Sequence, residues 1–307
     1  MTNQITLYGY ESSPFYQKVK NILAVKGLSH NLVEQAPMGA RQDLISIGVK
    51  YRRIPVLVIG KDVYLDSALI NEKISNRCSG NKIKDEDNIV ALKSSELLVK
   101  NLFETIIGVA DFSTLPEVFI KDRQELWPDF AKNTGQRPQH MTQLRGHLQY
   151  FEEHFKDNRA FLSGEEISII DLSICFVLDF ALNKIQYSAL PGFGASEFPK
   201  VYEWIKRFSD HVDSCYKNIE VQKISGEDAK KNILGSTESF ESVEHSDYDP
   251  LNLKVGDKVA LLPTDQSNVY SQPGELVALN AKSVTVALDS GIRLHAPRIG
   301  FQIQKVE

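Results

Sequence analysis

Cysteine is scarce in this chain, with three residues among 307, Cys78, Cys175 and Cys215. They lie far apart in the sequence and outside any metal-ligand spacing, so we expect neither a disulfide framework nor a cysteine-based metal site. An odd number of isolated thiols is typical of proteins in a reducing compartment. We therefore predict a cytoplasmic protein without a bound metal, whose thiols are buried or half-buried.

The sequence also lacks long apolar runs and an excess of positive charge. No run reaches membrane-spanning length, and no charged-then-apolar signal segment follows Met1. The formal net charge of −5, with both signs intermixed, gives no basic surface for nucleic acid or an anionic membrane. We therefore predict no nucleic-acid or membrane partner. The hydrophobic content of 42% is sufficient for the cores of two or three domains.

The stretch 52–70 is the most informative part of the sequence. It predicts a strand, a tight turn, a second strand and a helix start, at 52–58, 59–62, 63–65 and 66–70. Pro55 heads the first strand, a position where a proline does not interrupt the sheet ladder. A cis Ile54–Pro55 bond, about 0.5–1 kcal/mol uphill, would turn the Ile54 backbone outward towards an extended ligand. An ordinary β-hairpin that leads into a helix is the alternative interpretation.

The first 34 residues predict strand, helix and strand. Residues 5–10 are β-prone, and apolar residues then recur at helical spacing up to Gly27. Ser13 is a natural N-cap for this helix, and Pro14 is a natural first helical residue. A second strand candidate follows at 30–34. The order within about the first eighty residues is therefore β-α-β-α-β-β-α.

This order resembles the thioredoxin-like half of the cytosolic glutathione transferases. Ser-Pro-Phe-Tyr at 13–16 stands at the place of a redox Cys-Pro-Tyr-Cys, and Pro55 precedes the third strand. The stretches 51–57 and 64–70 are most similar to fungal members of that superfamily. The resemblance extends to about residue 220, and it implies a thioredoxin-like glutathione-binding domain at 1–80.

The sequence from Asp85 onward is helical in pattern. One apolar face is marked by Ile89, Leu92, Leu97, Leu98, Leu102 and Ile106. Further on, Ser168 and Asp171 have the spacing of a capping box, with Ile167 and Leu172 at staple spacing. This arrangement resembles the buried capping box of glutathione transferases, a folding device without a chemical role. We predict an all-helical glutathione transferase C-terminal domain at 85–220.

Within that domain, the segment 111–138 is less regular and includes short helices at most. It is where we expect a family-specific cap over a substrate pocket. Its aromatic residues are Phe112, Phe119, Trp127 and Phe130. They could line an apolar acceptor site, but plain core is the favoured interpretation of such spacing.

After residue 220 the resemblance ends. The Ser-rich, acidic stretch 221–249 predicts a linker with one short helix at 227–234. Five short strand candidates follow, at 255–261, 274–279, 283–288, 291–295 and 301–304. Strands this short need closure to bury their faces, so we predict a small β-barrel at 250–307 that is similar to Src-homology or Tudor barrels. His295, Arg298 and Phe301, near the closing strands, could reach a partner or the mouth of the pocket, but turn and core roles are the favoured interpretation.

This barrel is the main departure from the family, because ordinary glutathione transferases lack such an extension. A barrel of about sixty residues is marginal alone, so we expect its apolar side to contact the helical domain. It is a candidate binding module for a protein partner.

The resemblance assigns the chemistry to Ser13, at the position of the activating hydroxyl of serine-type transferases. The glutathione thiol, with a pKa near 8.5, must become a thiolate to attack an electrophile. The Ser13 hydroxyl would donate to the sulfur, and the helix that begins at Pro14 would add partial positive charge. Ser12 and Tyr8 are the runners-up. The alternative is that Ser13 is only an N-cap.

The resemblance also assigns binding residues to the other parts of the glutathione tripeptide. Ile54, before Pro55, pairs with the cysteinyl unit. The helix start at 66–67 holds the γ-glutamyl end, where Ser67 takes the carboxylate and Asp66 takes the ammonium. Arg53 stands where the family often has a lysine that faces the glycyl carboxylate.

Four further residues are candidates for contacts with glutathione. Phe15 completes the expected glutathione-binding set. Arg52 and Lys50 could replace Arg53, although a surface-charge role is the favoured interpretation of both. Arg41 is a weaker candidate for the same glycyl end.

Two classes of function are compatible with these residues. The first is a glutathione transferase, a homodimer that uses glutathione as co-substrate and conjugates it to a small apolar electrophile in detoxification. Glutathione-dependent isomerase or peroxidase activity is left open. The second is a non-catalytic regulator or scaffold whose C-terminal barrel binds a partner. Ser13, Pro55, Asp66 and Ser67 favour the enzyme, whereas the added barrel favours the scaffold.

Overall fold

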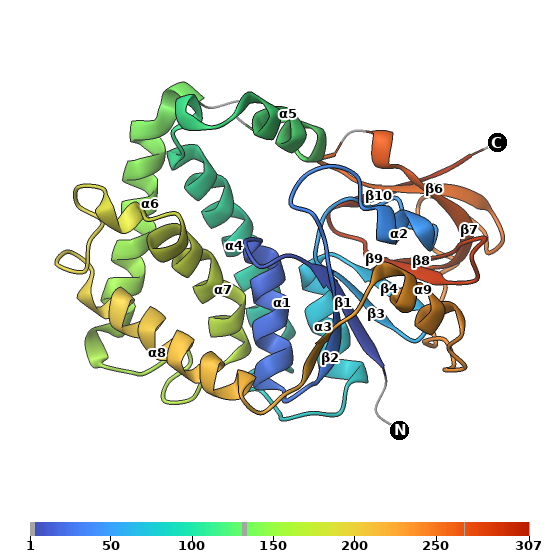
Figure 1. The fold of residues 1–307 in the computed structure, drawn as a ribbon, viewed down its shortest axis with the longest axis horizontal. Helices are drawn as coiled ribbons and strands as arrows, with labels where there is room; N and C mark the ends of the chain where they lie inside the picture. Colours follow the sequence, from blue (N-terminus) through green and yellow to red (C-terminus); the bar gives the residue numbers. More distant parts are fainter. Residues whose placement is uncertain (1–3, 131–133, 267, 307) are drawn as a thin grey trace.

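The computed structural model describes residues 4–130, 134–266 and 268–306. The helices in Figure 1 are α1 (Pro14–Val25), α2 (Gln42–Ser46), α3 (Ser67–Arg77), α4 (Ile89–Val109), α5 (Glu117–Leu126), α6 (Arg137–His154), α7 (Ile169–Asp179), α8 (Pro199–Tyr216) and α9 (Gly226–Leu234). The strands are β1 (Ile5–Gly9), β2 (His30–Glu34), β3 (Val56–Ile59), β4 (Asp62–Leu65), β5 (Val221–Lys223), β6 (Lys258–Pro263), β7 (Gln272–Leu279), β8 (Ser283–Ala287), β9 (Arg293–Pro297) and β10 (Phe301–Lys305). The order up to α3 confirms the predicted thioredoxin-like arrangement.

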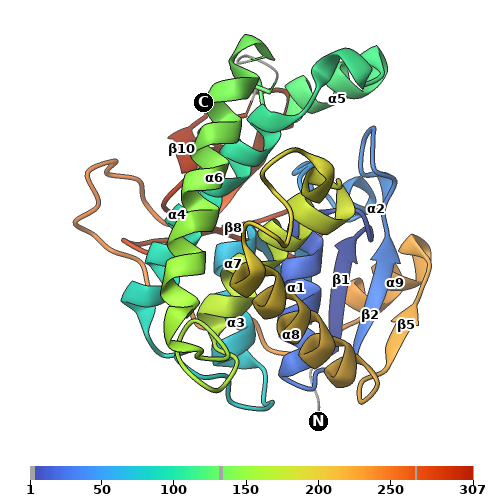
Figure 2. The same cartoon turned by 90° about the vertical axis from the view of Figure 1, so that its left-hand side faces the viewer.

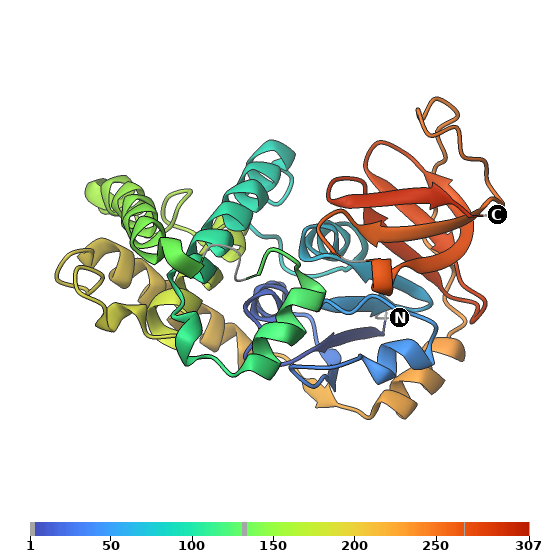
Figure 3. The same cartoon turned by 90° about the horizontal axis from the view of Figure 1, so that it is seen from above.

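A ten-stranded sheet of described residues runs through the molecule, in the order β10-β6-β7-β8-β9-β4-β3-β1-β2-β5. Within its thioredoxin-like part, β1 pairs in parallel with β2 and antiparallel with β3, and β3 pairs antiparallel with β4. On its other edge β4 pairs in parallel with β9, Asp62 opposite Arg293 and Tyr64 opposite His295. The C-terminal strands therefore extend the thioredoxin-like sheet (Figure 3).

The C-terminal strands β6–β10 are antiparallel neighbours in the order β10-β6-β7-β8-β9. The last strand pairs with the first, and an irregularity between Leu276 and Ala278 bends β7, as expected for a sheet that curls on itself. This region is consistent with the predicted small barrel-like module. His295 and Phe301 are buried in it, as core residues.

The two faces of the thioredoxin-like sheet belong to different cores because side chains alternate along a strand. On the front face, Leu7 and Leu57 join a core with α1, α3 and the helices α4, α6, α7 and α8. On the back face, Tyr8 and Val58 join a core with α2, α9 and the C-terminal strands. The prediction that the barrel leans on the helical domain is therefore wrong. The barrel packs on the back and the edge of the thioredoxin-like sheet, where apolar strand faces were available.

Residues 221–234, which the sequence analysis assigned to a linker, contribute a strand to this sheet and a helix to the core on its back face. β5 pairs in parallel with β2 at its far edge. The short helix α9 was predicted, and Ser225 caps it by accepting a hydrogen bond from the Asp228 backbone N–H at 3.0 Å. The sequence analysis missed β5 because three residues carry too little periodicity. The exact domain boundaries stay predictions.

The segment between α9 and β6 is also fixed to the sheet. The Glu241 backbone N–H donates to Asp62 Oδ2 at 2.7 Å, and the Glu241 carboxylate accepts from Tyr64 at 3.0 Å and from Lys73 at 2.6 Å. Further along, Ser246 N–H donates to the carbonyl of Leu279 in β7. The tract is irregular in conformation, but hydrogen bonds at Glu241 and Ser246 hold it against the sheet.

The helical domain contains the predicted capping box. Ser168 Oγ accepts from Asp171 N–H at 3.3 Å, and Asp171 Oδ2 accepts from Ser168 N–H at 3.0 Å. Asp171 Oδ1 accepts further from Leu162 N–H and from Trp204 Nε1. Burial nevertheless raises the pKa of the Asp171 carboxyl. The box is a buried structural hub, as predicted.

Two expectations drawn from composition concern membranes and thiols. Among the described residues, no helix combines the length and the apolar character needed to cross a membrane. Cys78 and Cys175 are buried free thiols and Cys215 is a half-buried one, which confirms the prediction for all three.

Candidate functional site

The predicted site residues lie at one end of the thioredoxin-like sheet. Tyr8 in β1 is paired with Val56 in β3, and Val56 is paired with Leu65 in β4. The segment after β1, the residues before β3 and those after β4 consequently meet at this end. These segments carry Ser13, Ile54 with Pro55, and Asp66 with Ser67. In Figure 2 the arrows of β1 and β2 point towards this end, which α5 overlies.

Ser13 is the N-cap of α1, as predicted. It is 6% exposed, and its Oγ accepts a hydrogen bond from the Tyr16 backbone N–H at 3.3 Å. Capping uses a lone pair of this oxygen, so the hydroxyl hydrogen remains able to donate to a further acceptor. The first-turn N–H groups of α1 and its dipole add positive potential at the same place. The geometry suits an anion next to Ser13.

The two runners-up for the thiol contact lie elsewhere. The Tyr8 side chain lies on the back face of the sheet, in the core shared with the C-terminal strands. It is fully buried there, and burial raises the pKa of its phenol. The alternation of side chains in β1 thus removes Tyr8 from the site. Ser12 is exposed in the turn before the cap.

The Ile54–Pro55 peptide bond is cis, as the sequence analysis suggested. It lies directly before β3, so Pro55 takes no place within the sheet ladder. Pro55 is buried, whereas Ile54 is half-buried. The hairpin β3–β4 that leads into α3 is present as well. The predicted cis bond and the predicted hairpin therefore occur together in this stretch.

Asp66 caps α3 with an unusual backbone. Its φ of 69° and ψ of 131° lie in a region that non-glycine residues seldom adopt, and its Oδ1 accepts from Ala68 N–H at 2.9 Å. Strained positions of this kind cluster at ligand sites. Beside it, Ser67 is 7% exposed, and its Oγ accepts from Lys18 Nζ at 3.5 Å.

Lys18 and Glu96 form a pair beneath this helix start that the sequence analysis missed. Lys18 is fully buried, and its Nζ lies 2.5 Å from Glu96 Oε1. Asn71 donates to the same carboxylate oxygen at 3.3 Å. The pair joins α1, α3 and α4. No local pattern in the sequence signals it, because Lys18 and Glu96 are 78 positions apart.

Arg53, the candidate for the glycyl carboxylate, reaches away from the sheet towards α5 and the C-terminal strands. Its Nη1 lies 2.9 Å from Asp265 Oδ1, and its Nη2 donates to the carbonyl of Leu126 at 2.7 Å. The side chain is 27% exposed.

Arg52 and Arg41 are buried, so the surface-charge interpretation of Arg52 is wrong. Arg52 is 1% exposed, donates to the carbonyls of Gly39 and Asp122, and forms an ion pair with Asp122 of α5. Arg41 donates to the carbonyls of Arg52 and Ala36. Burial lowers the pKa of the Arg41 guanidinium. Both arginines fix the loop after β2, whereas Lys50 is exposed as expected.

Phe15 begins a chain of aromatic contacts that leads from the site into the cap segment. The ring centroids lie 5.0 Å apart for Phe15 and Phe103, 6.3 Å for Phe103 and Trp127, and 6.0 Å for Trp127 and Phe130. Phe112 and Phe119 pack edge-on against Phe130. Phe130 is buried core, while the other rings are half-buried. Residues 131–133 of this segment lie outside the described residues.

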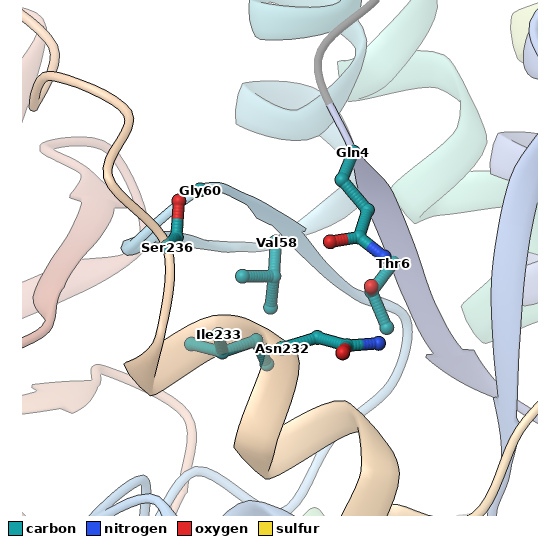
Figure 4. A pocket seen from close by; sticks show the side chains of 7 residues that line it. All are labelled: Gln4, Thr6, Val58, Gly60, Asn232, Ile233 and Ser236. Carbon is teal, nitrogen blue, oxygen red and sulfur yellow. The ribbon is translucent and has the colours of Figure 1, made fainter.

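A small cavity lies at the opposite end of β1 and β3. Figure 4 shows the residues that line it, among them Gln4, Gly60, Asn232 and Ser236, between the sheet and α9. Its volume of about 10 Å³ is room for about one water molecule. It is unrelated to the predicted site. No group of three His, Cys, Asp or Glu side chains that could hold a metal occurs among the described residues.

Comparison with known proteins agrees with this fold. The family model described as glutathione S-transferase, N-terminal domain, matches residues 7–82. This match supports the resemblance to the glutathione transferase superfamily. A second model, described as a domain of unknown function, matches residues 111–217. A probable glutathione S-transferase from Glycine max is 24% identical over 208 residues, which cover 67% of this chain and 84% of that protein.

Solved structures of the superfamily show the same fold. A glutathione S-transferase-like protein from Pseudomonas syringae matches with a TM-score of 0.71 and 23% identity, over 100% of both chains. A glutathione transferase family member from Pseudomonas fluorescens, with two glutathione molecules bound, has a TM-score of 0.51 and 15% identity over 69% of this chain and 92% of that chain. The first match extends over the whole chain, C-terminal strands included. The fungal resemblance stays a prediction.

Proposed function

We propose that this protein is a glutathione transferase that activates the glutathione thiol with Ser13. The observation that carries the proposal is the convergence of Ser13, the cis Ile54–Pro55 segment and the Asp66–Ser67 helix start at one end of the sheet. The Pseudomonas fluorescens relative with glutathione bound and the family model for residues 7–82 support glutathione as the co-substrate.

In this proposal the thiol loses its proton because the site favours the anion. The Ser13 hydroxyl donates to the sulfur while its oxygen still accepts from Tyr16 N–H, and α1 directs its N-terminus at the same atom. Lowering a thiol pKa from about 8.5 to 7 or below requires about 2 kcal/mol or more. One charge-assisted hydrogen bond and a helix end supply this order of magnitude.

The remainder of glutathione then lies along the same end of the sheet. The Ile54 backbone pairs with the cysteinyl unit, ahead of Pro55. The first N–H groups of α3 and the Ser67 hydroxyl take the γ-glutamyl carboxylate, with buried Lys18 behind them as additional positive charge. The Asp66 carboxylate takes the ammonium, Phe15 flanks the sulfur, and Arg53 serves the glycyl carboxylate.

The acceptor site lies between Ser13 and the cap. Half-buried aromatic rings lead from Phe15 through Phe103 to Trp127, so a small apolar electrophile would meet the thiolate there. The thiolate sulfur forms a bond to the electrophilic carbon. The displaced electron pair departs with a leaving group or, in addition to an activated double bond, moves to a neighbouring atom that takes a proton from solvent. Among the described residues, no feature selects isomerase or peroxidase chemistry instead.

The scaffold alternative is not favoured. A binding module should present an apolar groove or strand face to its partner, but the inner faces of β6–β10 are used in the core shared with the thioredoxin-like sheet. The homodimer, the cytoplasmic location and a role in detoxification remain predictions from the resemblance.

Calorimetric titration tests the proposal directly. Glutathione should bind with a stoichiometry of one per chain, and its S-methyl ether should bind as well, because the ether keeps every peptide contact. Only glutathione should release protons on binding near neutral pH, and this release is measured by repeating the titration in buffers of different ionisation enthalpy. If neither compound binds, the assignment of this end of the sheet is wrong.

A further inference from the structure

The cation assigned to the glycyl carboxylate already faces a carboxylate of the same chain. Arg53 Nη1 lies 2.9 Å from Asp265 Oδ1, and Arg53 Nη2 also lies 3.4 Å from the Asp265 carbonyl. Asp265 follows β6, 212 positions further along the chain. Among the described residues, every hydrogen bond of the Arg53 guanidinium goes to Asp265 or to Leu126.

The segment that carries Asp265 is held in place on both sides. Behind it, Thr264 N–H donates to the carbonyl of Gly300 at 2.9 Å. Ahead of it, the Tyr270 hydroxyl donates to Glu125 of α5 at 2.9 Å, and the Arg52 guanidinium lies 5.7 Å from the Tyr270 ring centroid. The C-terminal strands, α5 and the segment 52–53 thus meet beside the candidate site, and Asp265 is presented to Arg53 by this junction.

We propose that Asp265 is a built-in competitor for the C-terminal carboxylate of the peptide thiol. The inference rests on the proposed function, because it takes the glycyl end of glutathione to lie at Arg53. The Asp265 carboxylate occupies Nη1, and the carbonyls of Leu126 and Asp265 occupy Nη2, so no pair of adjacent N–H groups is left to bind a ligand carboxylate at two points while Asp265 stays in place. Binding of glutathione requires that Asp265 leaves Arg53, and the barrel thereby sets the affinity of the thioredoxin-like site.

Arg53 can exchange the Asp265 carboxylate for a ligand carboxylate at low cost. The Arg53 side chain is 27% exposed and the Asp265 side chain is 42% exposed, so both groups stay partly hydrated. Exchange of one carboxylate for another preserves the charge on Arg53 and returns Asp265 to water. The partner class is therefore a γ-glutamyl thiol with a free terminal carboxylate, and a thiol without that carboxylate leaves the pair intact.

The test compares two ligands and three proteins by calorimetric titration. The ligands are glutathione and its glycyl monoethyl ester, which lacks only the terminal charge. The proteins are the unmodified chain, Asp265→Asn, and Asp289→Asn as a matched control in an exposed turn between β8 and β9. We expect Asp265→Asn to bind glutathione about two- to fivefold more tightly, the range expected for a partly exposed ion pair. Its affinity for the ester should be unchanged, and Asp289→Asn should match the unmodified chain.

Three results would overturn the inference. Unchanged glutathione affinity in Asp265→Asn means that no competition exists, and weaker affinity means that Asp265 positions Arg53 for the ligand. Equal tightening for glutathione and its ester places the effect away from the glycyl end. In each of these cases glutathione still binds, so the proposed function stands. Absence of binding by all three proteins rejects the proposed function and the inference together. Thermal unfolding of each protein confirms that the variants are folded.

Discussion

The thioredoxin-like sheet is contacted by the helical domain on its front face and by the C-terminal strands on its back face and edge, and the two contacts are built differently. The front contact is made mainly by apolar side chains such as Leu7, Ile22 and Leu102. The back contact adds a backbone ladder between β4 and β9. A module joined by sheet hydrogen bonds and a shared core is part of the fold and not a tethered appendage.

The edge contact also contains a buried polar network. His295 Nε2 donates to Asp62 Oδ1 at 2.8 Å, and His295 Nδ1 lies 3.0 Å from Thr285 Oγ1. Arg77 Nη1 donates to Asp62 Oδ2 at 2.8 Å. Asp62 and His295 are 1% and 2% exposed. Buried groups of this kind specify one geometry, because a shifted β9 would leave them without partners.

Removing the Asp62 charge should produce the largest loss of stability. Asp62→Asn leaves Arg77 and His295 without their anionic partner in a buried site, which costs about 3–5 kcal/mol. Equilibrium urea unfolding measures this loss. Glu275→Gln is the control, because Glu275 pairs with Lys258 on an exposed part of the C-terminal strands and is worth about 0.2–1 kcal/mol. Equal losses in both variants would mean that the network contributes nothing specific.

The same variant has a defined pH signature. Burial acts to raise the pKa of the Asp62 carboxyl, but the hydrogen bonds from His295, the Glu241 backbone and Arg77 outweigh it and hold the pKa below its ordinary value. A lowered pKa contributes stability above the unfolded value of about 3.9, and that stability is lost as the pH falls through the folded pKa. The difference between the unmodified chain and Asp62→Asn should therefore shrink below about pH 4.

Leu294→Ala tests whether the two contacts unfold together. Leu294 in β9 is fully buried, and its truncation should cost about 2–5 kcal/mol. Both tryptophans, Trp127 and Trp204, lie in the helical part of the chain, so their fluorescence reports on the region farthest from the change. We expect Leu294→Ala to lower the urea concentration at the midpoint of unfolding, as measured by tryptophan fluorescence.

The control for this experiment is Ile299→Ala in the exposed turn before β10, where Ile299 is 78% exposed. It should leave the midpoint nearly unchanged. If Leu294→Ala leaves the urea midpoint measured by fluorescence unchanged, the C-terminal strands unfold separately from the helical domain. That result would contradict a core shared across the sheet.

Local sequence patterns predicted the features that depend on residues close together in the sequence. The Ser13 cap, the Pro55 strand start, the capping box at Ser168 and Asp171, and the short C-terminal strands all follow from residues within a few positions of each other. The order of domains followed from the family resemblance.

Contacts between distant residues were not predictable in this way. Asp62 was placed in a turn, yet it begins β4 and bonds His295 across 233 positions. Arg52 was taken for a surface charge because its partner Asp122, on α5, lies 70 positions further along the chain. The ladder between β4 and β9 could not be foreseen, since any exposed strand edge offers the same backbone groups. Such pairings leave no periodicity in a single sequence.

At the site itself, Asp66→Asn should weaken glutathione by about 2–3 kcal/mol in calorimetry, because the ligand ammonium loses its charged partner. Asparagine tolerates the positive φ of this position and keeps an oxygen for the cap to Ala68, so the fold should be preserved. Asp43→Asn, on α2 and away from the proposed γ-glutamyl contacts, is the control. An unchanged dissociation constant in Asp66→Asn would place the γ-glutamyl group elsewhere.

The central claim is that Ser13 stabilises the thiolate of bound glutathione, and a thiolate absorbance titration tests it most directly. The unmodified chain should show a thiol pKa clearly below the free value of about 8.5, and Ser13→Ala should raise it by about one unit, equivalent to about 1.4 kcal/mol. Ser12→Ala, in the neighbouring exposed position, should titrate like the unmodified chain. The lost cap costs about 1 kcal/mol, so binding of saturating glutathione is confirmed for each protein first. Identical titration curves for Ser13→Ala and the unmodified chain would contradict the account.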